Sequence, residues 1–242
     1  MSAPLPIFVL AGGTGGHVYP ALAVALALRE RGYGPRWIGT SRGLEARVVP
    51  AADIPLHTLP MRGVRGKNPL RQLQALVLLA ASLLWSVLLV LRHRPRLVIG
   101  MGGYASVPAA LAAWCCRRPL LLQEQNAVAG SANRLLARFA QRVTTGFPGV
   151  LEGRGDVRYL GNPVREDLLG VATTRPWRWA GEGPLQVLIL GGSLGAQAIN
   201  ETVPAVAGRL GERCRWRHQC GTLHDAAVRE AWSAVGAVEH RV

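Results

Sequence analysis

Short apolar runs and longer stretches of helical spacing alternate along the chain. The first apolar run, Ile7 to Ala11, predicts a buried parallel strand, and an apolar helical pattern follows from Pro20 to Arg31. Further strands are predicted at 36–40, 55–59, 97–101, 120–122 and 143–145, and further helices at 44–52, 104–117 and 131–142. Strands that alternate with helices in this way are typical of an α/β fold with a parallel sheet.

The pattern is interrupted between Gly170 and Pro184, where Thr-Thr, Pro-Trp and Gly-Glu-Gly-Pro fall close together. This composition predicts a linker at 170–184 that joins a domain at 1–169 to a second one at 185–242. The second domain is expected to hold strands at 185–190 and 215–219 and helices at 197–210 and 223–235. Because two strands do not make a stable doubly wound sheet, we expect this domain to be incomplete and the 242 residues to be a fragment of a longer protein.

Residues 72–91 form a run of twenty uncharged residues, of which sixteen are apolar. Basic residues flank the run, namely Arg62, Arg65, Lys67 and Arg71 before it and Arg92, Arg94 and Arg96 after it. Its length is enough to span a bilayer, but the strand candidates on either side, 55–59 and 97–101, belong in one sheet that a single crossing would divide. Three interpretations remain open: a buried packing helix, a helix that lies partly exposed on an anionic membrane surface, and a true span.

The net charge of +14 narrows the expected partners. Nearly all of it comes from arginine, since Lys67 is the only lysine. A genome-wide bias toward arginine explains this charge, and so does a surface that meets phosphates, acidic lipid or nucleic acid. Aromatic residues make up only 6% of the chain and no basic run alternates with them, so we expect no nucleic-acid partner.

The four cysteines favour a reducing compartment. They are Cys115, Cys116, Cys214 and Cys220, and none stands in a Cys-x-x-Cys spacing. Adjacent cysteines suit neither a zinc site nor a common disulfide pair, so four thiols are expected. The N-terminus has no basic region, its first charge being Arg29, and a cleaved signal peptide is therefore not expected.

Three glycine turns follow predicted strands, at 12–16, 102–103 and 191–195. A strand that turns through glycines into a helix points unobstructed N–H groups outward, and the start of the helix carries partial positive charge. The carboxyl ends of parallel strands share one edge of a sheet, so two such domains facing each other would enclose a cleft rich in N–H donors. Such a cleft suits a diphosphate, although a tight βα turn without a ligand gives the same local pattern.

His17 follows the first glycine turn and is the candidate base. The dipole at a helix start favours a neutral imidazole that accepts a proton; the alternative is a residue that only caps or packs. Glu124 and Asn126 end a predicted strand, where Asn126 could bind hydroxyls and Glu124 is either a functional acid or an exposed loop carboxylate. The second strand ends in Thr40-Ser41-Arg42 rather than in an acid for a ribose, which argues against a nicotinamide cofactor. Neither an Asp-x-Asp pair nor a Gly-x-Ser-x-Gly elbow occurs.

Five motifs stand in order along the chain: Ala11-Gly-Gly-Thr-Gly-Gly-His-Val-Tyr-Pro20, Gly100-Met-Gly-Gly-Tyr104, Glu124-Gln-Asn126, Gly161-Asn-Pro-Val-Arg165 and Gly191-Gly-Ser-Leu-Gly-Ala196. With these motifs the chain resembles the MurG family of bacterial N-acetylglucosaminyltransferases over essentially its whole length. The resemblance implies a GT-B fold with two Rossmann-like domains, the second incomplete here. It also implies inverting transfer of GlcNAc from UDP-GlcNAc to the MurNAc 4-hydroxyl of lipid I, which gives lipid II at the cytoplasmic face of the membrane. No metal or other cofactor is expected.

The resemblance also implies roles for individual residues. The catalytic candidates are His17, as base or acceptor-positioning group, and Glu124. The expected donor contacts are Thr14, Gly15, Gly16, Asn126, Arg165, Ser193 and Asn200. The acceptor side is expected to include Gly102, Gly103 and Tyr104. The apolar run 72–91 with its flanking arginines is the expected docking surface for the membrane that holds the lipid acceptor.

Two departures from the family pattern qualify this expectation. Gln123 stands where the family usually has histidine, and the family continues for about another hundred residues. That further part holds the uracil pocket, so we expect the 242 residues to bind acceptor better than donor and to be inactive alone. The alternatives are another GT-B sugar-nucleotide enzyme, such as an epimerase or a lipid glycosyltransferase, and a membrane-attached binding fragment without activity.

Overall fold

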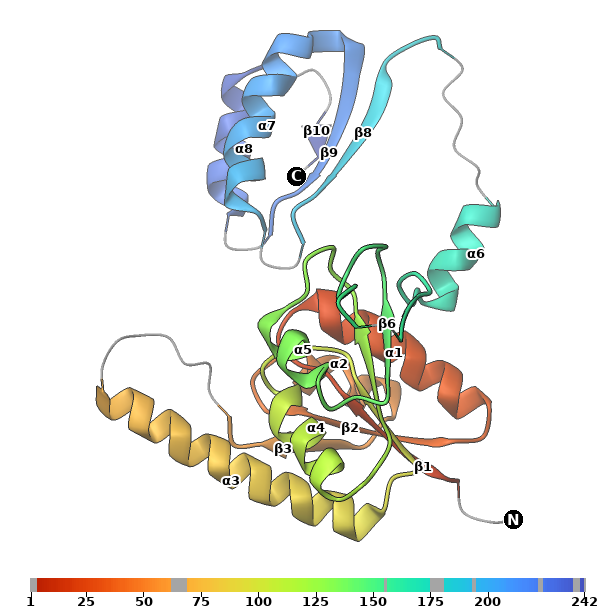
Figure 1. Cartoon of the computed structure of the whole chain (residues 1–242). Helices are drawn as coiled ribbons and strands as arrows, with labels where there is room; N and C mark the ends of the chain where they lie inside the picture. Colours follow the sequence, from red (N-terminus) through yellow and green to blue (C-terminus); the bar gives the residue numbers. More distant parts are fainter. Residues whose placement is uncertain are drawn as a thin grey trace. The chain divides into compact units, whose positions relative to one another are not determined.

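The computed structural model describes residues 4–61, 69–154, 156–174, 181–192, 195–221, 224–236 and 240–241. The chain divides into two compact units, Met1–Ala172 and Thr173–Val242, and each is described here by itself (Figure 1). Strands in both units pair only in parallel among the described residues, which confirms the predicted α/β class. The predicted domain limits of 169 and 185 stay a prediction, and a helix, α6, covers the first residues of the predicted linker.

The first unit is built on a seven-stranded sheet of order β3-β2-β1-β4-β5-β6-β7. The strands are β1 (Pro6–Leu10), β2 (Gly34–Thr40), β3 (Leu56–Leu59), β4 (Leu97–Gly100), β5 (Leu120–Glu124), β6 (Arg142–Thr145) and β7 (Val157–Tyr159). The helices are α1 (Gly15–Glu30), α2 (Glu45–Val48), α3 (Pro69–His93), α4 (Ser106–Cys115), α5 (Ser131–Leu136) and α6 (Glu166–Thr174), with a 3-10 turn η1 (Pro50–Ala52). The strand numbers fall from β3 to β1 and then rise from β4 to β7, so the order reverses between β1 and β4. Sheets of this kind bind ligands at such a reversal.

Alternate residues of the strands build two hydrophobic cores, one on each face of this sheet. Phe8 and Leu10 of β1 point to a core shared with α3, α4 and α5. Ile7 and Val9 point to a second core shared with α1 and the chain after β2. Every central strand is therefore buried on both faces, which explains why its sequence is a continuous apolar run rather than an alternating one.

Some predicted boundaries are wrong. Helix α1 begins at Gly15, five residues before the predicted start, so Pro20 lies inside the helix and not in its first turn. The helix predicted at 131–142 ends at Leu136, because the chain must turn back for β6, where the N–H of Gln141 donates to the carbonyl of Leu120. Strand β7 was not predicted, because three residues at a sheet edge leave little hydrophobic pattern.

Helix α3 contains one segment, Leu73–His93, that is long and apolar enough to cross a membrane. One side of the helix is packed against α4 and the sheet through Leu89 and Val90, while much of the remaining surface is exposed. The interpretation of residues 72–91 as a buried packing helix is therefore wrong. Strands β3 and β4, on either side of it in sequence, belong to one sheet, as predicted.

The second unit has a three-stranded sheet of order β10-β9-β8. Its elements are β8 (Leu185–Leu190), α7 (Gln197–Leu210), a 3-10 turn η2 (Gly211–Arg213), β9 (Cys214–Gln219), α8 (Asp225–Ala234) and β10 (His240–Arg241). Both helices contribute to one core with Trp216 and Trp232, which also takes Val187 and Ile189 of β8. The alternate residues Leu188 and Leu190 are exposed, so the helices cover only one face of this sheet among the described residues.

Candidate functional site

The first glycine turn joins β1 to α1 at the carboxyl edge of the sheet, and a buried carboxylate supports it from within. The Gly13 N–H donates to Glu45 Oε2 at 3.0 Å, while the N–H and hydroxyl of Thr40 donate to Glu45 Oε1 at 2.9 and 2.7 Å. A Cβ atom at Gly12 would lie only 2.7 Å from Glu45 Oε1, so this glycine is needed for close packing. The N–H of Gly13 thus faces the protein, and only the later residues of the turn can offer N–H groups to a ligand.

The start of α1 supplies those donors. Thr14 is the N-cap residue, its side chain makes no capping hydrogen bond, and its carbonyl accepts from the N–H groups of His17 and Val18. The N–H groups of Gly15 and Gly16 stand in the first turn, where no intrahelical acceptor is available. Thr14 and Gly16 are exposed. This geometry is the one that binds anions at helix starts, as the sequence predicts for these three residues.

The second glycine turn, after β4, packs directly against the first. Gly102 and Gly103 have φ values of +96° and +83°, a left-handed conformation that favours glycine. A Cβ atom at Gly103 would clash with the carbonyl oxygen of Gly12, and one at Gly102 would lie 2.8 Å from the His17 ring. The sequence prediction that these two turns share one sheet edge is confirmed.

His17 is held by an amide from a third strand end. Its Nδ1 atom lies 2.8 Å from Oε1 of Gln125, the residue that follows β5. The Gln125 Nε2 group donates to the carbonyl of Gln123 at 3.0 Å, which fixes the amide with its oxygen toward the imidazole. An amide oxygen only accepts, so Nδ1 carries the proton and the lone pair of a neutral ring is on Nε2. This is the tautomer that a general base needs at Nε2.

Glu124, a catalytic candidate from the sequence, is fully buried, and both of its carboxylate oxygens accept hydrogen bonds within the protein. Its Oε1 accepts from the N–H and the side-chain amide of Asn126 at 2.9 and 2.8 Å. Its Oε2 accepts from the N–H of Gly130 and from Nδ2 of Asn133, both at 3.0 Å. The exposed-loop interpretation of this carboxylate is wrong, and its contacts support a positioning role in which it holds the loop after β5. The predicted catalytic role receives no support from this geometry.

Asn126 itself is exposed, with its Nδ2 group turned toward Glu124. Its carbonyl oxygen is therefore the group that remains for a hydroxyl ligand, in agreement with the sequence prediction. Tyr104 is also exposed and directly follows the second glycine turn. These two side chains can meet a ligand without any change in the packing of the sheet.

Arg165 is anchored beside the first glycine turn. Its guanidinium carbon lies 5.2 Å from the centroid of the Tyr19 ring, and a Cβ atom at Gly15 would lie 3.2 Å from the same ring. Arg165 also forms an ion pair with Asp167 at 3.3 Å. The aromatic ring in α1 therefore brings a fixed cation close to the N–H donors of the helix start.

The third glycine turn lies in the second unit and has its own internal support. The Gly191 N–H donates to the carbonyl of Gln219, and a Cβ atom at Gly195 would clash with the carbonyl of Cys220. Asn200 is buried, and its amide donates to that Cys220 carbonyl at 3.0 Å, while its Oδ1 has no hydrogen-bond partner among the residues that the structure describes. Its contacts are structural, and the donor contact predicted for it stays a prediction. Ser193 lies outside the described residues. The cleft expected between the two domains stays a prediction.

Two residues that support the site, Glu45 and Gln125, were not predicted from the sequence. Glu45 stands three residues beyond Arg42, so it does not end the second strand, and it accepts a hydrogen bond from the glycine turn. Gln125 lies within the motif Glu124-Gln-Asn126, but its pairing with His17 joins residues 108 positions apart. Among the described residues, no group of three or more His, Cys, Asp or Glu side chains could hold a metal ion.

The fold and the helix start with its free N–H groups are typical of the class of α/β proteins that bind anionic ligands at the carboxyl edge of a parallel sheet. The model of the glycosyltransferase family 28 N-terminal domain matches residues 7–145, and that of the family 28 C-terminal domain matches residues 186–241. The chain belongs to glycosyltransferase family 28.

Relatives and solved structures agree with this assignment. A protein of Alkalilimnicola ehrlichii is 54% identical over 235 residues, which is 96% of this chain and 65% of the relative; its name is UDP-N-acetylglucosamine–N-acetylmuramyl-(pentapeptide) pyrophosphoryl-undecaprenol N-acetylglucosamine transferase. The chain thus spans slightly less than two thirds of that relative. The crystal structure of Acinetobacter baumannii MurG is 32% identical with a TM-score of 0.75, covering 99% of this chain and 68% of that one.

A third comparison concerns the fold alone. The UDP-GlcNAc 2-epimerase of Neisseria meningitidis, solved with UDP-GlcNAc, is 15% identical with a TM-score of 0.59, covering 98% of this chain and 71% of that chain. The structural neighbours of the chain are GT-B proteins, so the predicted fold type is confirmed.

Proposed function

We propose that this chain contributes the acceptor side and the start of the donor domain of an inverting N-acetylglucosaminyltransferase. The enzyme would move GlcNAc from UDP-GlcNAc to the 4-hydroxyl of MurNAc in lipid I, which gives lipid II for peptidoglycan synthesis. Membership of family 28 and the 54% identity with the A. ehrlichii transferase support the proposal. The chain covers 65% of that relative, and the activity is accordingly assigned to the complete gene product.

The observation that carries the mechanism is the hydrogen bond between His17 and Gln125. With Nδ1 protonated, Nε2 takes the proton of the acceptor 4-hydroxyl. The oxygen then forms a bond to C1 of GlcNAc, the bond from C1 to the UDP oxygen breaks, and its electron pair leaves with UDP. Attack opposite to the leaving group inverts the configuration at C1. Gly102 leaves room for the imidazole, because a Cβ atom at this position would lie 2.8 Å from the ring.

Anionic charge in the substrates needs cationic and N–H partners. The helix start at Thr14, Gly15 and Gly16 and the guanidinium of Arg165 provide both within the first unit. Such preorganised donors stabilise developing charge on a leaving diphosphate because they need no reorganisation during the reaction. Asn126 and Tyr104 are left to contact sugar hydroxyls.

Helix α3 is proposed as the surface that docks on the cytoplasmic face of the membrane. Large apolar side chains are exposed along it: Leu73, Leu76, Val77, Leu79, Leu84, Trp85, Leu88 and Leu91. Trp114 of the neighbouring α4 is exposed as well, and Arg117 follows at the end of that helix. An apolar face edged by arginines fits an interface between acyl chains and anionic headgroups. Because β3 and β4 share a sheet, the helix would lie on the membrane rather than cross it.

The test is to assay the complete gene product with UDP-GlcNAc and a lipid I analogue, as wild type and as His17→Ala. We expect lipid II from the wild type and a turnover lower by about 10²–10⁴-fold in the variant. Consumption of UDP-GlcNAc without lipid I would instead indicate an epimerase and contradict the proposal. Wild-type turnover by His17→Ala would contradict the assignment of the base. The 242-residue chain, assayed in parallel, is expected to form no lipid II.

A further inference from the structure

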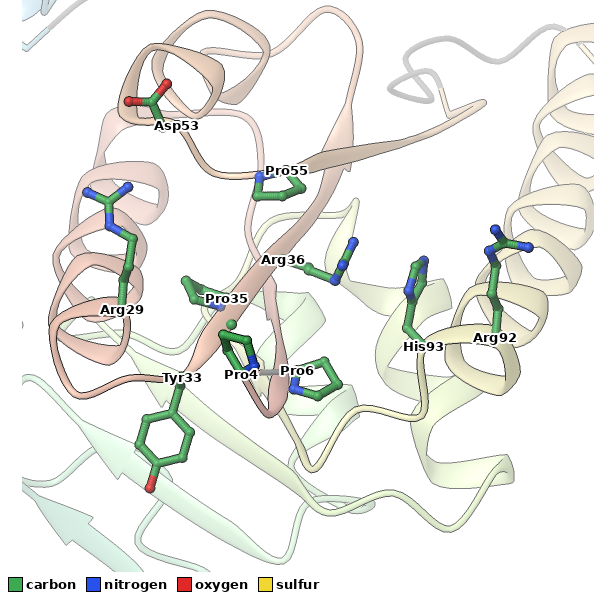
Figure 2. Close-up of a pocket in the computed structure, with 11 residues that line it drawn as sticks. Pro4, Pro6, Arg29, Tyr33, Pro35, Arg36, Asp53, Pro55, Arg92 and His93 are labelled. Carbon is green, nitrogen blue, oxygen red and sulfur yellow. The ribbon is translucent and has the colours of Figure 1, made fainter. Parts of the chain in front are cut away.

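A cavity lies at the edge of the first unit's sheet where the strands begin, away from the glycine turns at their carboxyl ends. Its volume is about 520 Å³, and it is bounded by the starts of β1 and β2, the segment before β3 and the ends of α1 and α3 (Figure 2). Four of its lining residues are prolines, which have no N–H groups to offer. A polar ligand in this cavity must therefore be recognised largely by side chains.

The charged side chains that line the cavity are mainly cationic. Arg29, Arg36, Arg92 and His93 line it, and Asp53 is the one carboxylate among the lining residues. In the described parts of the chain neither Arg36 nor Arg92 has an ion pair with a carboxylate. Three guanidinium groups around one carboxylate leave an excess of positive charge in a concave site.

Helix ends explain two of these arginines but not the third. Arg29 and Arg92 stand in the last turns of α1 and α3, where cations stabilise the helix dipole, and Arg29 also donates to the carbonyl of Ala52 at 2.7 Å. Arg36 is a half-buried residue of β2, paired in register with Phe8 of β1. No helix end requires a cation at that position, and its side chain reaches toward His93 (Figure 2).

Two histidines, His57 and His93, lie close to Arg36. The rings of His57 and His93 lie 5.0 Å apart, and the His93 ring packs 5.9 Å from Phe8. Burial lowers the pKa of both histidines, and the cation of Arg36 lowers each further. An anion placed between Arg36 and His93 would remove this repulsion.

We propose that this cavity binds a phosphate group, held by Arg36, Arg92 and His93. Guanidinium groups bind phosphate oxygens through paired, charge-assisted hydrogen bonds, and a histidine beside them gains a proton as the anion enters. The phosphate can belong to a phospholipid headgroup, since Arg92 and His93 end the helix proposed to lie on the membrane, or to a small free phosphate. This site is separate from the candidate base and does not depend on the proposed transferase activity.

The test uses the 242-residue chain and follows its histidine and arginine NMR signals. One titration adds inorganic phosphate and a second adds dihexanoyl-phosphatidylglycerol below its micelle concentration. We expect the Arg36 and His93 signals to shift and the titration midpoint of His93 to rise. Arg36→Gln and Arg92→Gln should each weaken binding about tenfold. The matched control is Arg31→Gln, because Arg31 is exposed just after α1, donates to the Ala27 carbonyl and does not line the cavity.

Arg36-dependent binding of inorganic phosphate assigns the site to free phosphates, and binding of the phospholipid alone assigns it to headgroups. The proposal is overturned if neither probe shifts the His93 signal, or if both glutamine variants bind as the wild type does. Should Arg36→Gln fail to fold, the exposed Arg92 carries the test, since its replacement leaves the sheet intact.

Discussion

The Nδ1 atom of His17 lies 2.8 Å from Oε1 of Gln125, which joins the first turn of α1 to the end of β5. Gln125→Leu removes the acceptor while keeping an apolar side chain of similar size. We expect the Nδ1-protonated tautomer to lose its preference and turnover of the complete gene product to fall about tenfold. Histidine ¹⁵N NMR of the chain reads the tautomer directly, independently of activity.

Gln125→Glu is the matched variant, because a carboxylate accepts the same hydrogen bond. It should restore the tautomer and also favour the imidazolium form, so the acid limb of the pH–rate profile should move to higher pH. A tautomer ratio that is the same in Gln125→Leu and wild type would show that the amide does not position the ring.

Gly102→Ala and Gly32→Ala separate backbone strain from displacement of the base. Both glycines have positive φ values, +96° and +82°, so each alanine should cost about 1–2 kcal/mol of unfolding free energy in urea titrations. A Cβ atom at Gly32 meets nothing within 4 Å, whereas one at Gly102 would lie 2.8 Å from the His17 ring. Only Gly102→Ala should therefore reduce turnover, and equal loss in both variants would contradict this role for Gly102.

The parts of the fold that could be predicted are those that local sequence determines. Apolar runs and glycine turns predicted the central strands, and helix α7 has its predicted bounds of 197–210. The end of α5 could not be predicted, because the helical pattern continues past Leu136 while the chain turns toward β6. Strand β10 has only two residues, His240 and Arg241, and so leaves no hydrophobic pattern.

The candidate site divides in the same way. The glycine turn at 12–16 was predicted, because adjacent residues form it, whereas the helix after it begins at Gly15 and not at the predicted Pro20. The contacts of Thr14, Gly15 and Gly16 with a ligand stay a prediction. The support given by Glu45 and Gln125 depends on which strand ends meet, 32 and 108 positions apart. Whether a carboxylate is reactive or structural depends on its burial, which the sequence does not give. For Glu124, the N–H and amide groups that donate to it could not be identified from sequence spacing alone.

Glu45→Ala should destabilise the first unit strongly. The change leaves the N–H of Gly13 and the N–H and hydroxyl of Thr40 without their acceptor inside the protein. We expect a loss of about 3 kcal/mol in unfolding free energy, measured by urea denaturation. The control is Glu30→Ala at the exposed end of α1, for which the change should stay within about 0.5 kcal/mol. Equal stability of the two variants would show that the turn does not need the carboxylate.

The histidine pair His57 and His93 should make the first unit less stable in acid. Burial is the largest cause that lowers the folded pKa of each histidine below the ordinary 6.5. His93 and Arg36 lower the pKa of His57 further, and Arg36 and Arg92 lower that of His93 further. The unfolded chain therefore binds protons that the folded chain does not, so this stability is fully present above about pH 6.5 and is lost as pH falls through the folded values. Urea midpoints at about pH 7.5 and 5.5 measure the effect. His57→Gln with His93→Gln should flatten the dependence, and an unchanged slope in that double variant would assign it to other groups.

The exposed face of α3 should determine binding to vesicles. Leu84 and Leu88 are 67% and 57% exposed, so Leu84→Glu with Leu88→Glu alters the surface with little effect on the core. Loss of two apolar anchors should weaken partition onto phosphatidylglycerol vesicles about a hundredfold in co-sedimentation. Ile199→Glu with Val206→Glu on α7, at residues 36% and 40% exposed, adds the same two charges elsewhere and should bind nearly as the wild type does. If the α3 variant still sediments with vesicles as the control does, the membrane contacts a different surface, and Arg117 after α4 and Arg134 of α5 become the next residues to replace.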